Sequence, residues 1–358
     1  MKRTVLGGLT ARTFLRRHWQ KRPLYVPGTL PGGWSDSGGL IDERALRTLA
    51  MREDVESRLV TRRGRRWNTQ HGPFASRIRL EPRNASLLVS GVNLHRPAAD
   101  ALLRRFDFLP QARLDDVMVS YATPGGGVGP HVDWYDVFLL QGPGKRAWTV
   151  WSPDRTSKQN YLARPGDLLY LPAGWQHDGV ALEPCYTYSI GFRAPAGREL
   201  GAAFLDWLHE RGLPDARYRD PDLSPARSPA SLPQSMIDFA QRALRRIRWT
   251  RSDVARFLGE YLTEPKPHIV FSRGKTRGLL ERCRVRLDPK TQLLYRGTQF
   301  FINGESFRAS ARDARALRAL ADLREVAGAT LGRPVLAKLI REWQRDGFLH
   351  LQPASGHQ

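Results

Sequence analysis

The spacing of apolar and polar residues divides the chain into parts of different character. Residues 1–110 mix short helical stretches with polar turns, and the segment 40–50 (LIDERALRTLA) places its leucines near one face of a helix. Residues 114–195 instead hold short apolar or alternating runs separated by glycine and proline, among them DDVMVSYA, RAWTVW, DLLYLP and YTYSIGF. Many short strands joined by such turns are typical of a β-sandwich or a β-barrel.

The pattern becomes helical after residue 198. The runs ELGAAFLDWLHERG, SMIDFAQRALRRIRW and DVARFLGEYL each predict a helix, and a connector rich in proline and serine separates the first from the second. From about residue 265, two strands, two helices and a closing GFLHLQP predict a small domain resembling a winged helix. We therefore predict an α+β protein with domains at 1–197, 198–263 and 264–358. The apolar helix faces within 198–263 predict a homodimer.

The charge of the chain suggests a polyanionic partner. Lysine and arginine number 57 against 35 acidic residues, which gives a formal net charge of +22 spread over all thirds of the sequence. Such a field attracts RNA or ribosomes. The alternative is an arginine-rich composition that only solvates the surface.

The remaining composition predicts a cytoplasmic protein. No apolar run approaches the roughly 20 residues that span a bilayer, which predicts no membrane association, and the N-terminal apolar stretch is too short for a signal peptide. The two cysteines, Cys185 and Cys283, lack the paired spacing of a zinc site or a secreted disulfide framework.

A candidate metal site lies in the strand-rich part. If HVDWYDVF is a strand, His131 and Asp133 point to the same side, about 6.5 to 7 Å apart at the backbone. His177 lies at the start of a turn that follows the strand DLLYLP. This turn could bring His177 back across a barrel towards the other two residues. Two histidines and one carboxylate form the facial triad of non-haem iron(II) oxygenases. A histidine and aspartate two apart are a weak signal alone, since an isolated histidine is more often a packing residue.

Two other interpretations of this region are disfavoured. The run PGGGVGP has Pro130 at the last glycine position of the dinucleotide-binding fingerprint, and a strand follows it instead of a helix. A hydrolytic zinc site would be expected to have a helical H-E-x-x-H or a cysteine pair, and neither accompanies the triad. We therefore predict iron(II).

An oxygenase of this class needs a dicarboxylate co-substrate, and a buried carboxylate requires a fixed cation such as arginine. Arg146 heads the strand RAWTVW, one hairpin after the metal strand, and is placed for this role, whereas Lys145 would point to the opposite side. From position alone, Arg146 could equally be one of many surface arginines.

Several motifs together closely resemble the bacterial ribosomal oxygenases of the JmjC/cupin group. They are HVDWYDVFLLQGPGKRAW, PGDLLYLPAGWQHDGVALE and YSIGFRAP, with FLRRHWQKRPLYVPG, EDVESRLV and HGPF towards the N-terminus. The resemblance spans roughly residues 10 to 225, and beyond them only the order of domains is similar. It implies a double-stranded β-helix barrel, followed by a helical dimerisation region and a small winged-helix-like domain.

The resemblance also implies an activity. Iron(II) would be held by His131, Asp133 and His177, with no catalytic residue beyond these ligands. Arg146 would bind the distal carboxylate of 2-oxoglutarate, with Ser120 as a hydroxyl partner. The reaction would be hydroxylation of an arginine β-carbon in large-subunit ribosomal protein sixteen, of the uL16 type.

The likeness further implies a pocket for the target arginine. Asp116, Met118 and Tyr135 match its positions, and a carboxylate, an apolar surface and an aromatic face together suit a guanidinium on an alkyl stem. Two alternatives stay open: a JmjC oxygenase with another protein target, or a nucleic-acid-binding protein in which the barrel is a scaffold.

Overall fold

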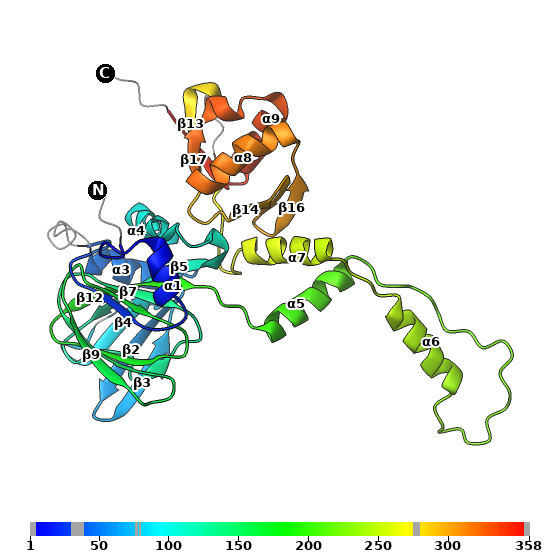
Figure 1. Cartoon of the computed structure of the whole chain (residues 1–358), viewed down its shortest axis with the longest axis horizontal. Helices are drawn as coiled ribbons and strands as arrows, with labels where there is room; N and C mark the ends of the chain where they lie inside the picture. Colours follow the sequence, from blue (N-terminus) through cyan, green and yellow to red (C-terminus); the bar gives the residue numbers. More distant parts are fainter. Residues whose placement is uncertain (1–4, 30–38, 76–77, 79, 275–279, 354–358) are drawn as a thin grey trace. The chain divides into compact units, whose positions relative to one another are not determined.

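The computed structural model describes residues 5–29, 39–75, 78, 80–274 and 280–353. Two antiparallel sheets form the predicted barrel (Figure 1). The eight-stranded sheet has the order β1-β10-β7-β12-β5-β4-β2-β3 and the four-stranded sheet the order β6-β11-β8-β9. The larger sheet consists of β1 (Leu24–Val26), β2 (Ser57–Arg63), β3 (Arg66–His71), β4 (Ala85–Val89), β5 (Leu114–Ala122), β7 (Val137–Gln141), β10 (Leu168–Leu171) and β12 (Cys185–Phe192). The smaller consists of β6 (His131–Val132), β8 (Arg146–Trp151), β9 (Lys158–Ala163) and β11 (Gln176–Ala181).

An aromatic cluster joins the N-terminal helix α1 (Ala11–Arg17) to the larger sheet. Thr10 caps α1 by accepting a hydrogen bond from the backbone N–H of Thr13. Phe14 of this helix is fully buried, and its ring centroid lies 5.4 Å from that of Phe138 and 5.0 Å from that of Tyr170. Offset and edge contacts of this kind add to the free energy gained by burying the rings. These contacts anchor the larger sheet, whose strands β5 and β12 contribute Ser120 and Thr187 to the cavity described below.

The helix predicted within residues 40–50 is confirmed as α3 (Glu43–Ala50). Asp42 caps it, its side chain accepting the backbone N–H of Ala45 at 2.8 Å. Leu46 and Leu49 are buried in the core, as the leucine spacing predicted. A further short helix, α4 (Pro97–Leu103), begins with proline at its first turn.

The strand predicted over HVDWYDVF is broken in the structure. β6 ends at Val132 and β7 begins at Val137, so Asp133 lies in the intervening bend and not within a strand. The cause is Asp136, which is fully buried and accepts hydrogen bonds from the hydroxyl of Tyr170 at 2.6 Å and the amide of Gln20 at 3.1 Å. A buried carboxylate requires such donors, and the bend directs it towards them.

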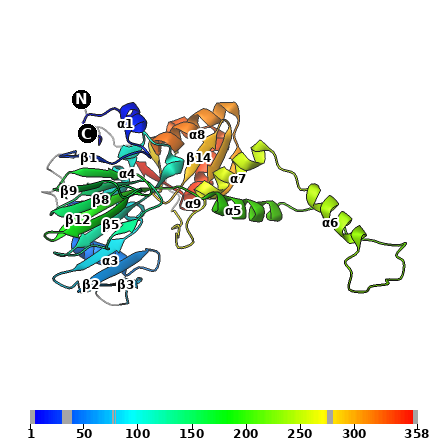
Figure 2. The ribbon, with the colours of Figure 1, turned by 60° about the horizontal axis from the view of Figure 1, so that its bottom comes forward.

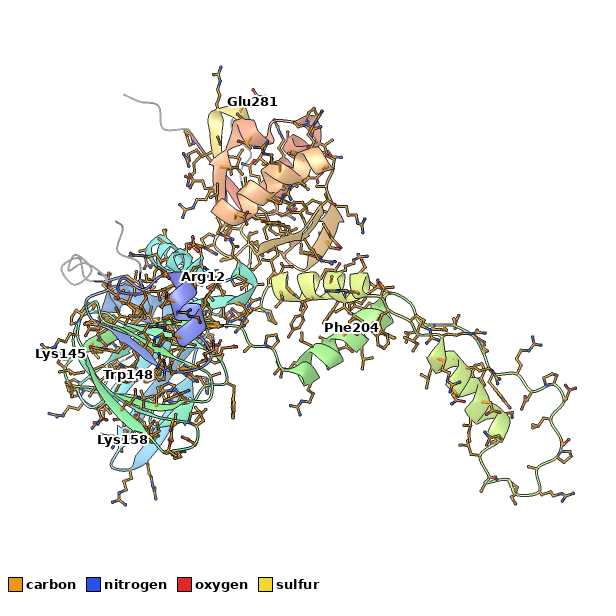
Figure 3. The ribbon with its side chains drawn as sticks, in the orientation of Figure 1. Arg12, Lys145, Trp148, Lys158, Phe204 and Glu281 are labelled. Atoms are coloured by element: carbon orange, nitrogen blue, oxygen red, sulfur yellow. The ribbon has the colours of Figure 1, made fainter. Side chains whose placement is uncertain are left out.

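Residues 195–264 and 292–314 form one compact unit. It contains α5 (Gly197–Glu210), α6 (Gln234–Arg245), α7 (Arg251–Thr263) and the sheet β14 (Leu293–Arg296), β15 (Gln299–Ile302) and β16 (Glu305–Arg308). Phe204 of α5, which is labelled in Figure 3, packs against Phe257 of α7 with ring centroids 5.1 Å apart. Glu260 of α7 accepts hydrogen bonds from the indole of Trp207 at 2.6 Å and from Arg211 at 2.7 Å. All three predicted helices of this region are thus confirmed.

The C-terminal part has more strands than predicted. The sequence predicted two strands before two helices, whereas β13 (Cys283–Leu287) and then β14, β15 and β16 precede α8 (Ala311–Leu323), which is followed by β17 (Glu325–Ala327), α9 (Pro334–Arg345) and β18 (Leu349–Pro353). The missed signal is Asn303-Gly304, both with positive φ, which closes a two-residue hairpin between β15 and β16. None of the described helices is long and apolar enough to cross a membrane.

Candidate active site

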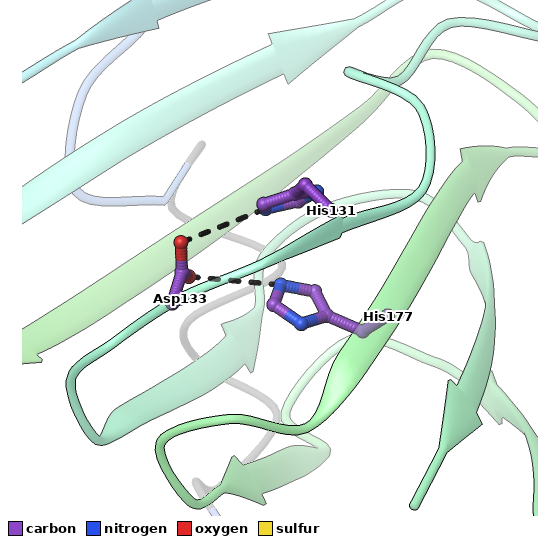
Figure 4. A group of neighbouring side chains, drawn as sticks. All are labelled: His131, Asp133 and His177. Carbon is purple, nitrogen blue, oxygen red and sulfur yellow. Dashed lines mark ion pairs between the residues drawn. The ribbon is translucent and has the colours of Figure 1, made fainter. Parts of the chain in front are cut away.

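His131, Asp133 and His177 come together as the sequence predicted (Figure 4). Their candidate ligand atoms all lie within 4.8 Å of one another. The Nε2 of His131 is 3.9 Å from one carboxylate oxygen of Asp133, and the Nε2 of His177 is 3.7 Å from the other. Strands β6 and β11 pair antiparallel with His131 directly opposite His177, so the strand register sets the separation of the two imidazoles.

Backbone carbonyls orient both imidazoles. The Nδ1–H of His131 donates to the carbonyl of Gly129 at 2.9 Å, and that of His177 donates to the carbonyl of Trp175 at 3.1 Å. A carbonyl can only accept, so each ring has its proton on Nδ1 and leaves the Nε2 lone pair directed at Asp133. Burial, with the neighbouring His131, lowers the pKa of His177, which favours the neutral form that binds metals.

The donor set suits a divalent metal with open coordination positions. It offers two neutral imidazole nitrogens and one carboxylate from a single side of the site, the arrangement of non-haem iron(II) oxygenases. His177 is buried, whereas His131 and Asp133 are partly exposed towards a cavity of about 280 Å³. A metal held here would therefore be accessible from the cavity.

Arg146 supplies a fixed cation to the same cavity. Its side chain is 5% exposed, and its Nη2 donates to the Ser120 hydroxyl at 3.4 Å. Among the described residues, neither its buried Nε nor the buried hydroxyl of Thr187 has a hydrogen-bond partner. Lys145, as predicted, lies apart from it, exposed and paired with Glu183 at 3.6 Å. Buried donors of this kind are normally satisfied, so the cavity is suited to an anionic ligand.

Thr187 was missed by the sequence reasoning. It stands opposite Ser120 in the register of β12 and β5, and both hydroxyl residues line the cavity with Arg146. The available signal was the alternation in YTYSIGF, which puts Thr187 and Ser189 on one face of the strand.

Asp116, Met118 and Tyr135 line the same cavity as the triad and Arg146. One oxygen of Asp116 accepts the backbone N–H of Gly91 at 2.6 Å. Burial, reinforced by the charge of Asp115, raises the pKa of Asp116 to about 6. Burial and then Asp133 raise the pKa of Tyr135 to about 12, so its hydroxyl stays protonated.

Lys266 and Glu56 are among the charged residues of the cavity that were not expected from the sequence. Lys266 lines it and lies 3.4 Å from the carboxylate of Asp115. Glu56, which immediately precedes β2, also lines it. No local pattern marks these residues, because they are remote in sequence from the strands that carry the triad.

Comparisons with known proteins agree with this geometry. The JmjC domain family matches residues 101–200, and the ROXA-like winged helix family matches residues 246–350. The fold and the site define the chain as a JmjC-type oxygenase. The likeness to solved structures covers nearly the whole chain: a structure of YcfD, a ribosomal oxygenase from Escherichia coli, superposes with a TM-score of 0.80 at 33% identity, over 96% of this chain and 98% of that one.

Within that class the relatives are specific. The ribosomal protein uL16 3-hydroxylase of Escherichia coli is 41% identical over 271 residues, which is 71% of each chain. A probable ribosomal oxygenase of Haemophilus influenzae is 38% identical over 207 residues, 52% of this chain and 50% of that one. A YcfD structure in complex with cobalt and 2-oxoglutarate has a TM-score of 0.80 at 32% identity over 96% and 98% of the two chains. The chain belongs to the bacterial JmjC ribosomal oxygenases.

Proposed function

We propose that this protein is an iron(II)- and 2-oxoglutarate-dependent hydroxylase that adds one oxygen to the β-carbon of an arginine in ribosomal protein uL16. The observation that carries the proposal is a single cavity lined by a 2-His-1-carboxylate triad and a buried arginine with an unsatisfied donor. Membership of the ribosomal oxygenases supports the same class of substrate.

Each part of the cavity has a distinct task in this proposal. His131, Asp133 and His177 hold iron(II), and the Nδ1 hydrogen bonds to backbone carbonyls fix the direction of the two imidazoles. Bound iron and 2-oxoglutarate supply the oxidant, with dioxygen converted to one oxygen in the product and one in succinate, and with release of carbon dioxide. The chain itself contributes ligation, orientation and exclusion of side reactions.

Arg146 binds the distal carboxylate of 2-oxoglutarate. Its guanidinium offers planar donors, and the adjacent hydroxyls of Ser120 and Thr187 complete the set around an incoming carboxylate oxygen. The guanidinium also lies 5.6 Å from the centre of the Trp148 ring, which holds it through a cation–π contact. The co-substrate is thereby oriented with its other end towards the triad.

The target arginine binds between Asp116, Met118 and Tyr135. Asp116 pairs with the guanidinium, while Met118 and the ring of Tyr135 flank the alkyl stem. Anchoring the charged end directs a methylene near the backbone towards the metal, and small errors in such placement greatly reduce the rate. The raised pKa of Asp116 matters here, because only the ionised form pairs with a cation.

Tandem mass spectrometry of uL16 incubated with enzyme, iron(II) and 2-oxoglutarate tests the proposal. The expected result is a gain of one oxygen on one arginine, at the β-carbon. The Asp133→Ala enzyme is the control and should give no gain, and a target peptide with lysine for the arginine should react poorly because it lacks the planar fork. A gain mapped to another residue type, or no gain, would refute the substrate assignment.

The protein is also proposed to be a homodimer through its 198–263 segment. Helix α6 has no buried residue in the described chain, yet it carries exposed Met236, Ile237 and Leu244. An isolated helix of about 12 residues is marginal in water, so such a helix needs a partner surface. The division into 1–197, 198–263 and 264–358 assigns catalysis to the first segment, dimerisation to the second and a winged-helix-like domain to the third.

Cytoplasmic location follows from a ribosomal substrate and belongs to the same proposal. The net charge of +22 additionally favours contact with ribosomal RNA. If the arginine-rich composition only solvates the surface, no part of the surface should be preferred for contact with ribosomal RNA.

A further inference from the structure

The hairpin of β2 and β3 forms a basic surface near the catalytic cavity. Its residues 57–71 (SRLVTRRGRRWNTQH) contain five arginines and no carboxylate. β3 is an edge strand of the larger sheet, and every residue in it is exposed. In Figures 1 and 2 the light-blue hairpin extends beyond the neighbouring strands of the barrel.

The tip of the hairpin carries three exposed arginines. Arg63, Arg65 and Arg66 are exposed, and in the part of the chain that the structure describes none of them forms an ion pair. The two-residue turn between the strands contains Gly64 with a φ of +60°, which keeps the connection tight. One of the three arginines therefore lies in the turn, and the other two lie at the strand ends that flank it.

Trp67 fixes this hairpin against the loop that precedes the metal ligand His131. A β-carbon added to Gly129 would lie 3.0 to 3.3 Å from the indole atoms of Trp67, so ring and loop are in close contact. Gly129 also accepts the Nδ1 hydrogen bond of His131. On the hairpin itself, the Arg62 guanidinium lies 5.4 Å from the Trp67 ring centre. The basic tip thus has a defined position relative to the active site.

We propose that the β2–β3 hairpin is an RNA-docking surface that binds phosphates next to the entrance of the active site. Guanidinium groups without internal partners match phosphate oxygens in charge and in geometry. A basic ribosomal protein would be repelled by the same surface, so the partner is the nucleic acid and not the polypeptide substrate. Arg58 of β2 lines the catalytic cavity and lies five residues before Arg63, so RNA held by the tip is roughly 17 Å along the strand from that cavity.

The identity of the RNA as ribosomal rests on the proposed function, but RNA binding by the hairpin does not. The test measures the affinity of the full-length protein for a fluorescein-labelled, 20-nucleotide single-stranded RNA of mixed sequence, by fluorescence anisotropy over a range of salt concentrations. The hairpin variant carries Arg63→Gln, Arg65→Gln and Arg66→Gln. A matched control removes the same charge from α1 through Arg12→Gln, Arg16→Gln and Arg17→Gln, which are also exposed.

The expected change follows from counterion release. Three lost phosphate contacts on single-stranded RNA lower the slope of log K against log salt by about 2, which corresponds to a roughly 100-fold weaker affinity at about 0.1 M salt. The α1 variant lowers only the overall positive charge of the protein, so its affinity for the RNA should fall less than about threefold. Thermal unfolding of both variants verifies that they fold, and ultraviolet cross-linking with peptide mapping locates the RNA on the unmutated protein, where residues 62–67 are expected.

Three outcomes would overturn the proposal. The first is an equal loss of affinity in the hairpin and α1 variants, which would assign RNA binding to diffuse charge. The second is a loss confined to a variant of α9 with Lys338→Gln, Arg341→Gln and Arg345→Gln, which would assign it to the C-terminal part. The third is a cross-link map without the hairpin. Peptide hydroxylation assayed without RNA should stay unchanged in the hairpin variant, so a failure here is distinguishable from a failure of the proposed hydroxylase activity.

Discussion

Replacing Arg146 by methionine should abolish most of the affinity for 2-oxoglutarate while leaving metal binding intact. The side chain is 5% exposed, has a buried Nε without a partner, and has no carboxylate within ion-pair distance among the described residues. A dicarboxylate bound there in the unsubstituted protein is desolvated and depends on this cation. Methionine has a similar length and fills much of the space without supplying charge or donors.

The magnitude follows from that burial. Removing one partner of a buried, hydrogen-bonded charge pair costs about 2 to 5 kcal/mol, equivalent to a roughly 30-fold to several-thousand-fold increase in the Kd for 2-oxoglutarate. The folded protein should not lose stability, because the substitution removes an unpaired buried charge. We expect a smaller increase in the Kd for 2-oxoglutarate in Arg146→Lys, since an ammonium restores the charge but not the planar arrangement of donors.

Anaerobic titration calorimetry measures the Kd for manganese(II) on the metal-free protein. It then measures the Kd for 2-oxoglutarate on the manganese(II)-loaded protein. The control is Lys145→Met, one residue earlier, where the exposed ammonium pairs with Glu183 and the Kd for 2-oxoglutarate should change less than about twofold. An unchanged Kd in Arg146→Met with an unchanged fold would assign the carboxylate to another residue. A parallel loss of manganese affinity would instead mean that the substitution disturbs the triad.

Three further predictions concern the triad, the substrate pocket and the oligomer. Asp133→Ala should abolish metal-dependent succinate formation, measured by coupled assay, because it removes the only carboxylate of the triad. The kcat/KM for the target peptide should fall about tenfold per pH unit below pH 6, since Asp116 is protonated there and its ion pair with the substrate is lost. Asp116→Asn should be weakly active and lack this inflection. Leu244→Glu on α6 should convert a dimer into monomers by light scattering.

Each of these predictions has a contradicting result. Full turnover in Asp133→Ala would exclude it as a ligand, and a pH profile with the same inflection in Asp116→Asn would assign the titration to another group. Because the pKa of Asp116 is higher in the folded protein than in the unfolded chain, its ionisation disfavours the fold at neutral pH, and Asp116→Asn should raise Tm at pH 7.5. A monomeric unsubstituted protein would remove the dimer proposal.

The sequence by itself determined the class of fold and the chemistry of the metal site. Alternating runs with glycine and proline turns predicted the barrel because a strand exposes its two faces in a period of two, and the helices α5, α6 and α7 were predicted from helical patterns. The triad was predictable because only a few side-chain types bind iron and because the motifs around it resemble those of the ribosomal oxygenases, whereas the spacing of His131 and Asp133 alone was a weak signal. Even so, the supposed strand through Asp133 is a bend, set by the buried Asp136.

Only the tertiary structure decided what surrounds that site. The position of Arg146 in the sequence was equally compatible with a surface arginine. The register of β8 within its sheet places Arg146 in a buried position beside Ser120. Thr187 joins them because β12 pairs with β5, and Trp67 of the edge hairpin lies against Gly129 in the loop before His131. These contacts join segments many residues apart, whereas local patterns report only on neighbours within a turn or strand. Strand order and register, set by packing of the whole core, therefore decided which side chains share the cavity.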